Sequence, residues 1–222
     1  MKNEKRMAWI LQFQEINKLM EDQLEKWHSI TEIRKTYDEF IKNLKKLTDL
    51  QPDLEKNLDP IQHELKEKRE NLIGKIFPLT NILAVYITDK KLKKGTRSMI
   101  ISKDELNKLK KAKLLDLASR ILKTTEKYLP DPGMEDNELF SHGITAIMVD
   151  EFSSALTKYA YALQLNKDLL NSRSKSRKTS NRLLKVNLEI LHKRLDRLMT
   201  VFSVTHPSFY QDYASIRRSK TA

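Results

Sequence analysis

The chain has 222 residues, of which 39% are hydrophobic and 32% charged, and its formal net charge is +12. It contains 4 glycines and 6 prolines, too few for the many turns of an all-β sandwich or barrel. The absence of cysteine excludes disulfides, thiol catalysis and cysteine-ligated metal sites. This length allows one or two domains, and the composition favours a few long helices.

Apolar residues recur at helical spacing along the N-terminal part of the chain. They step by three or four residues over 9–27 and form a regular heptad seam over 30–47. The sequence Ser-Ile-Thr-Glu at residues 29–32 matches a capping box, which predicts a helix break just before it. A linker is expected over residues 49–59, and Pro78 predicts a kink or break in the helix that follows.

The C-terminal half contains further helical stripes. Ser102 opens a second predicted capping box, and Thr145 is the expected cap of a helix whose stripe ends at Leu170. Residues 171–181 contain no apolar side chain, so they are either a linker or an exposed helical stretch. A leucine seam follows over 184–202, and Pro207 opens a predicted tail helix.

Six such stripes with short connections predict an all-α fold, an antiparallel bundle of about six long helices with a short C-terminal tail helix. We expect one all-helical domain over residues 1–222, or two sub-bundles, 1–128 and 145–222, joined by an acidic loop at 129–144. No stretch approaches the roughly 18 apolar residues of a membrane span, and the N-terminal apolar run is shorter than a signal peptide requires. We therefore expect no membrane span and a cytoplasmic location.

Positive charge is concentrated in two regions, and these are the main functional signal. Residues 90–128 and 151–222 each carry a net charge of +9, whereas residues 1–89 carry −1. Clusters of this kind are typical of surfaces that bind polyanions, and also of solvated helices. The candidate polyanion-binding residues are Lys90, Lys91, Lys93, Lys94, Arg97, Arg173, Lys175, Arg177, Lys178 and Arg182.

The sequence carries no recognisable catalytic or metal-binding motif. Its glycines are too far apart to form a phosphate-binding loop, and no Glu-x-x-His pair of a di-iron bundle is present. His63 with Glu67 and His192 with Asp196 have the spacing of a ligand pair on a helix, but two ligands do not make a site. We therefore expect no catalytic residue, no cofactor and no metal.

The C-terminal tail resembles a known group of proteins. The sequence Pro-Ser-Phe-Tyr-Gln-Asp-Tyr at residues 207–213, followed by Arg217, is similar to the tail of uncharacterised bacterial all-helical bundle proteins. The junctions at residues 27–30 and 143–146 are similar to joints in the same group. That group has no assigned activity, so the resemblance implies an all-helical fold and no catalytic residue.

Three functional hypotheses follow. The first is a non-enzymatic helical interaction or scaffold module, with a protein partner or self-association, because heptad seams pair within or between chains. The second is a basic module that binds nucleic acid or another polyanion through residues 90–113 and 173–185; it is the less favoured one because no nucleic-acid recognition motif is present. The third is an enzyme whose site is assembled from distant residues, which would show a deep cavity lined by buried ionisable groups.

Overall fold

The computed structural model describes residues 3–90, 101–128 and 138–219, and all regular structure in these ranges is helical. The predicted all-α class is therefore confirmed. The helices, in chain order, are α1 (Asn3–Asp22), α2 (Leu24–Trp27), α3 (Thr31–Asp49), α4 (Gln51–Glu55), α5 (Asp59–Asp89), α6 (Lys103–Lys108), α7 (Lys111–Tyr128), α8 (Glu138–Ser141), α9 (Ala146–Ile190), the π-helical segment η2 (Leu191–Leu195), α10 (Asp196–Met199), α11 (Phe202–Thr205) and α12 (Pro207–Arg218).

Two of the predicted helix caps are present. The Ser102 hydroxyl accepts a hydrogen bond from the Glu105 amide at 3.3 Å, and the Glu105 carboxylate accepts one from the Ser102 amide at 2.9 Å. This reciprocal pair is the capping box that starts α6. The Thr145 hydroxyl accepts from the Met148 amide at 3.2 Å and caps α9.

The capping box predicted at Ser29 is wrong. The N-cap of α3 is Ile30, which makes no side-chain capping bond, and the helix begins at Thr31. The Glu32 carboxylate, which would complete the box, is instead bonded to Lys35 at 3.0 Å. The predicted break is nevertheless present, because α2 ends at Trp27.

Two segments for which the sequence predicted a break, or left a break open, are continuous helix. Residues 171–181 lie inside α9, so the second of the two predicted alternatives, an exposed helical stretch, describes them. Pro78 lies within α5, which runs unbroken from Asp59 to Asp89. The Thr80 hydroxyl donates to the carbonyls of the preceding turn, including that of Phe77 at 2.9 Å.

The chain divides into two compact units. Unit 1 contains residues 1–56 and 170–222, and unit 2 contains residues 57–169. This division differs from the sub-bundles 1–128 and 145–222 expected from the sequence. The reason is that the two ends of the chain pack against each other, a long-range contact that leaves no local pattern.

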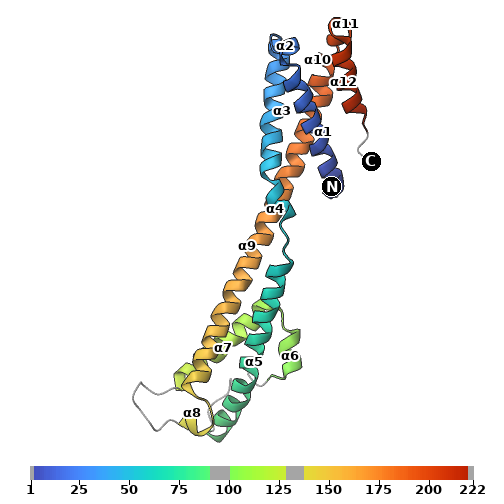
Figure 1. Ribbon diagram of the computed structural model, residues 1–222. Helices are drawn as coiled ribbons and strands as arrows, with labels where there is room; N and C mark the ends of the chain where they lie inside the picture. Colours follow the sequence, from blue (N-terminus) through green and yellow to red (C-terminus); the bar gives the residue numbers. More distant parts are fainter. Residues whose placement is uncertain (1–2, 91–100, 129–137, 220–222) are drawn as a thin grey trace. The chain divides into compact units, whose positions relative to one another are not determined.

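Unit 1 is built around a seam of aromatic and aliphatic side chains. Helix α1 contacts both α3 and α12 (Figure 1). The rings of Phe13 and Phe40 meet edge to face at 5.4 Å, and those of Phe202 and Phe209 lie 5.2 Å apart. The buried Trp27 indole donates to the Met20 carbonyl at 2.8 Å. Phe209 and Tyr213 of α12 are buried in this core, so the tail helix is docked into unit 1.

Unit 2 packs α5 against α6, α7 and the first part of α9. Leu72, Ile121 and Phe152 are among its fully buried side chains. Arg69 of α5 donates to carbonyls at the end of α6, including that of Leu109 at 2.7 Å. These bonds satisfy acceptors that a helix C-terminus leaves unpaired.

One stretch of the described chain meets the simplest criterion for a membrane span. An 18-residue window within Thr31–Asp89 has a mean hydropathy of 1.3. This finding differs from the expectation, stated from the sequence, that no stretch would qualify. It is a weak indication, because 44% of the window is buried inside the protein and core helices of soluble proteins pass the same test.

Gly74→Ala should stabilise unit 2. Gly74 lies within α5, and a Cβ added there meets no atom within 4 Å. Alanine has less conformational freedom in the unfolded chain, so the free energy of unfolding should rise by about 0.5–1 kcal/mol. Urea denaturation followed by far-ultraviolet circular dichroism measures the change. Gly143→Ala is the control and should be destabilising, because the φ of Gly143 is 90°; shifts of the same sign would contradict this explanation.

Candidate functional site

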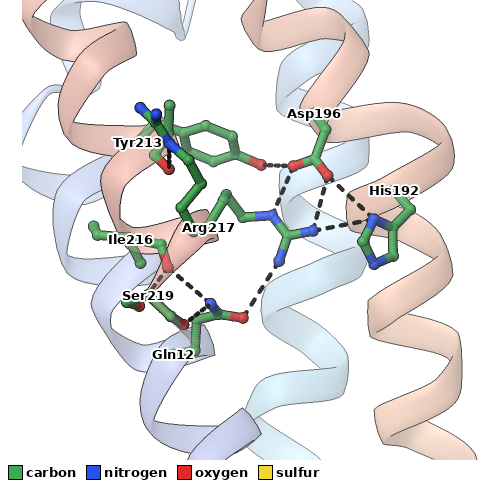
Figure 2. A network of polar contacts seen from close by, with 9 residues as sticks. Gln12, His192, Asp196, Tyr213, Ile216, Arg217 and Ser219 are labelled. Atoms are coloured by element: carbon green, nitrogen blue, oxygen red, sulfur yellow. Dashed lines mark hydrogen bonds and ion pairs between the residues drawn. The ribbon is translucent and has the colours of Figure 1, made fainter. Parts of the chain in front are cut away.

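The densest polar network in the described part of unit 1 centres on the carboxylate of Asp196 (Figure 2). The Tyr213 hydroxyl donates to Asp196 Oδ1 at 2.6 Å. The Arg217 guanidinium donates to both carboxylate oxygens, through Nε and Nη2, each at 2.8 Å. Two residues of α12 are thus bound to the first residue of α10, and the Arg217 contact is bidentate.

Gln12 of α1 joins this network to the end of the tail helix. Its amide nitrogen donates to the Ile216 carbonyl at 2.7 Å and to the Ser219 carbonyl at 3.3 Å, as Figure 2 shows. Its amide oxygen accepts from Arg217 Nη1 at 3.3 Å. Gln12 is almost completely buried, and it satisfies acceptors at the C-terminus of α12 that would otherwise lack a partner.

Electrostatics hold the two tail residues in fixed protonation states. Burial raises the pKa of the Tyr213 phenol far above its usual value, and the nearby Asp196 charge raises it further. Burial alone lowers the pKa of Arg217, but the hydrogen bonds and charge of Asp196 outweigh this effect and raise it overall. Tyr213 therefore stays neutral and Arg217 stays positive.

The π-helical segment η2 lies directly before Asp196. Both of its terminal residues, Leu191 and Leu195, are fully buried. His192, between them, places Nδ1 at 3.3 Å from Arg217 Nη2 and at 3.5 Å from Asp196 Oδ2. Short π-helical segments are frequent at functional sites, so the residues around η2 are candidates for a chemical role.

A surface pocket of about 400 Å³ opens beside the network. It is lined by Asp196, Tyr210, Tyr213, Ala214, Arg217 and Arg218. The carboxylate and the guanidinium in this pocket are paired with each other, so neither is presented as a free acid, base or nucleophile. The arrangement is suited to holding α12 in place, and we interpret it as a structural lock.

The other predicted histidine pair is also formed, without producing a metal site. His63 Nε2 lies 3.5 Å from Glu67 on the surface of α5. In the described ranges, no group of three or more histidine, aspartate or glutamate side chains is placed to hold a metal ion. His142, which the sequence left unassigned, contacts Asp89 at 3.2 Å and the ring of Tyr86 at 5.3 Å.

The structure locates part of the predicted polyanion-binding set. Lys90 is exposed at the C-cap of α5 in unit 2, whereas Lys91, Lys93, Lys94 and Arg97 lie outside the described residues. The remaining members lie on α9 in unit 1: Arg173, Lys175, Arg177, Lys178 and Arg182. These five residues do not all lie on one side of α9, because only residues three or four positions apart share a face of a helix.

Two groups result on α9. Lys175, Lys178 and Arg182, joined by Lys185, step by three, four and three residues, and all four side chains are exposed. We call these four residues the basic face. Arg173 and Arg177 lie four residues apart on a different side of the helix, next to its buried face. The sequence grouped both sets together because charge counting ignores helical rotation.

Comparison with protein-family models, curated proteins and solved structures found no match to this chain. The interpretation of both regions therefore depends on their own geometry. Sequence reasoning missed Gln12 altogether and treated the Asp196–His192 pair as isolated, because the residues that complete the network come from the far end of the chain.

Asp196→Asn should destabilise unit 1. It removes the charge that Arg217 and Tyr213 bind, and hydrogen bonds to charged groups contribute about 1.5–3 kcal/mol. Trp9 and Trp27 are the only tryptophans and both belong to unit 1, so denaturation followed by tryptophan fluorescence reports this unit selectively. Asp212→Asn, an exposed site on α12, is the matched control and should stay within about 0.5 kcal/mol of the parent. Equal losses in both variants would rule out the lock.

Tyr213→Phe should flatten the loss of stability at alkaline pH. The pKa of Tyr213 is higher in the folded state than in the unfolded chain. Its contribution to stability is therefore complete below about pH 10 and is lost as pH rises further, by up to about 1.4 kcal/mol per pH unit. Tryptophan-monitored denaturation between pH 9 and about pH 11 measures the slope. Tyr210→Phe, on the same helix, should keep the parent slope; an unchanged slope for Tyr213→Phe would count against the proposed origin.

Proposed function

We propose that the chain is a non-enzymatic helical interaction module that binds a polyanion through the basic face of α9. The observation that carries this proposal is the spacing of Lys175, Lys178, Arg182 and Lys185 on one exposed side of a continuous helix. Their side chains can contact a single extended anionic surface together, because they project from one straight face.

The opposite side of α9 anchors this orientation. Ser176, Ser180, Leu183 and Asn187 are buried there, so the helix cannot rotate the basic face inward without losing its packing. The Asn187 side chain donates to the Phe40 carbonyl of α3 at 3.1 Å and fixes the rotation further. The cations are therefore held outward by the core.

The charge of the basic face is not compensated locally. No acidic residue occurs between Asp168 and Glu189. None of the four side chains makes an ion pair or hydrogen bond to another residue in the described ranges. Uncompensated charge on one face raises the local concentration of anions and steers association.

The dimensions fit a linear polyanion. From the first to the last residue of the basic face the helix rises about 15 Å, at 1.5 Å per residue. A nucleic-acid backbone places several phosphates within that distance. The face carries no aromatic side chain for base stacking, so we expect recognition of the backbone with little sequence preference.

A scaffold role without a polyanion partner is the second candidate. It is supported by the Asp196 lock, which shows that the tail helix is built into the core of unit 1. The antiparallel bundle of about six long helices predicted from the sequence would be its framework. Heptad seams of this kind would then serve a protein partner or a second copy of the chain.

Charge reversal tests the basic face. Lys178→Glu combined with Arg182→Glu should weaken binding of a short fluorescent DNA duplex, measured by anisotropy at several salt concentrations. If four phosphates are neutralised in the parent, the slope of log affinity against log salt should be about −3.6, and the double variant should reduce its magnitude by about 1.8.

Lys42→Glu with Lys45→Glu is the matched control, because it makes the same charge change on exposed residues of α3. This control should keep most of the parental slope. Equal weakening in both double variants would show attraction to net charge alone. No binding of duplex DNA or of single-stranded RNA at low salt would overturn the polyanion proposal and leave the scaffold role.

A further inference from the structure

A second basic feature lies where the start of α1, the short helix α4 and the middle of α9 meet in unit 1. The Gln51 side chain of α4 donates to the Met7 sulfur of α1 at 3.5 Å. Arg173 of α9 donates through Nη2 to the Leu54 carbonyl of α4 at 3.0 Å. These contacts bring Arg6, at the start of α1, close to the arginines of α9.

Three guanidinium groups gather at this junction. Arg6 is only 3% exposed, Arg173 is half-buried and Arg177 is exposed. Burial lowers the pKa of Arg6 most, and the charges of Arg177 and Arg173 lower it further, while Glu55 acts in the opposite direction. Like charges held this close repel each other, so a bound anion would stabilise the arrangement.

The acidic residues nearby compensate only part of this charge. Glu55 offsets some of the repulsion at Arg6, and the Asp53 carboxylate accepts a hydrogen bond from Ser176 at 3.0 Å. Neither forms an ion pair with Arg173 or Arg177 in the described part of the chain. Positive charge therefore remains on the α9 side of the junction.

The α9 arginines border a small pocket with donors to spare. A pocket of about 230 Å³ is lined by Leu170, Arg173, Ser174 and Arg177. The Nε of Arg173 is buried and has no hydrogen-bond partner in the described structure. Arg177 makes no hydrogen bond or ion pair to a described residue. An unpaired buried donor is unfavourable in itself, which points to an acceptor that binds here.

We propose that Arg6, Arg173, Ser174 and Arg177 form a binding site for a phosphate group, either free phosphate or a phosphomonoester. A phosphate dianion offers several acceptor oxygens, and the planar guanidinium fork matches them better than lysine does. Arg173 and Arg177 would donate directly, with the Ser174 hydroxyl between them, while buried Arg6 contributes charge from the α1 side. The pocket volume suits one small anion.

This site goes beyond the proposed polyanion function, since it uses a different side of α9. The basic face is an exposed row of mostly lysine side chains for an extended partner. The phosphate site is a recess beside the buried face, with guanidinium groups from two helices. The two can therefore succeed or fail independently.

Thermal unfolding of the full chain, followed by tryptophan fluorescence, tests the site with sodium phosphate against sodium chloride at equal ionic strength. The melting temperature of the parent should rise by at least about 4 °C when phosphate is in large excess over its Kd. Arg177→Gln should abolish this rise. In chloride it should melt no lower than the parent, because it removes a like charge beside Arg6.

Lys178→Gln is the matched control, because it removes the same charge one residue away, on the basic face. Lys178→Gln should keep the phosphate-dependent rise in melting temperature and weaken duplex DNA binding. Arg177→Gln should lose that rise and keep duplex DNA binding. No rise in the parent, or an equal rise in Arg177→Gln, would overturn the site. Failure of DNA binding alone would affect only the polyanion proposal.

Adenosine monophosphate and adenosine separate the two sources of the ligand. A rise with the monophosphate at lower concentration than with free phosphate would support the site and identify a phosphomonoester. The opposite order would support the site and identify free phosphate. An equal rise with adenosine would overturn the proposal, because the nucleoside has no phosphate group.

Discussion

The bidentate contact between Asp196 and Arg217 fixes the position of α12 against α10 in unit 1. This unit is made from the two ends of the chain, and joining distant segments carries an entropic cost that grows slowly with the length between them. Burial of Phe209 and Tyr213 offsets that cost without selecting one position along the helix. The charge-assisted bonds select it, because a guanidinium fork meets both oxygens of one carboxylate in only one register.

The middle of α9 buries polar side chains in place of apolar ones, and these polar side chains fix the rotation of the helix. Where a leucine seam would continue, the helix buries Ser176, Ser180 and Asn187. Two of these side chains reach other helices, Ser176 to Asp53 at 3.0 Å and Asn187 to the Phe40 carbonyl at 3.1 Å. The Ser180 hydroxyl and the Asn187 carbonyl oxygen have no partner in the described structure. Polar contacts thus orient the helix, and that orientation turns the lysine row outward and places Arg173 beside α4.

Helix-capping signals in the sequence were reliable at two positions, where both capping partners lie within one helical turn of each other. The Ser102 capping box and the Thr145 cap involve residues three positions apart, and both are formed. The Ser29 box is absent because α3 begins one residue later than predicted, with Ile30 at the N-cap. Gln12 bonds a carbonyl 204 positions away, and no spacing rule could reveal such a partner. The same limit hid Arg6, and it also hid the pairing of the two chain ends.

The discontinuity of unit 1 has a consequence for its synthesis. All of residues 57–169 leave the ribosome before residues 170–222 do, so unit 2 has its complete sequence first. Until then, the residues of 170–222 that pack against Phe13 and Phe40 are missing. The apolar sides of α1 and α3 are therefore open to solvent and to other nascent chains. Chaperone demand during translation should therefore fall on α1 and α3, which emerge before residues 170–222 do.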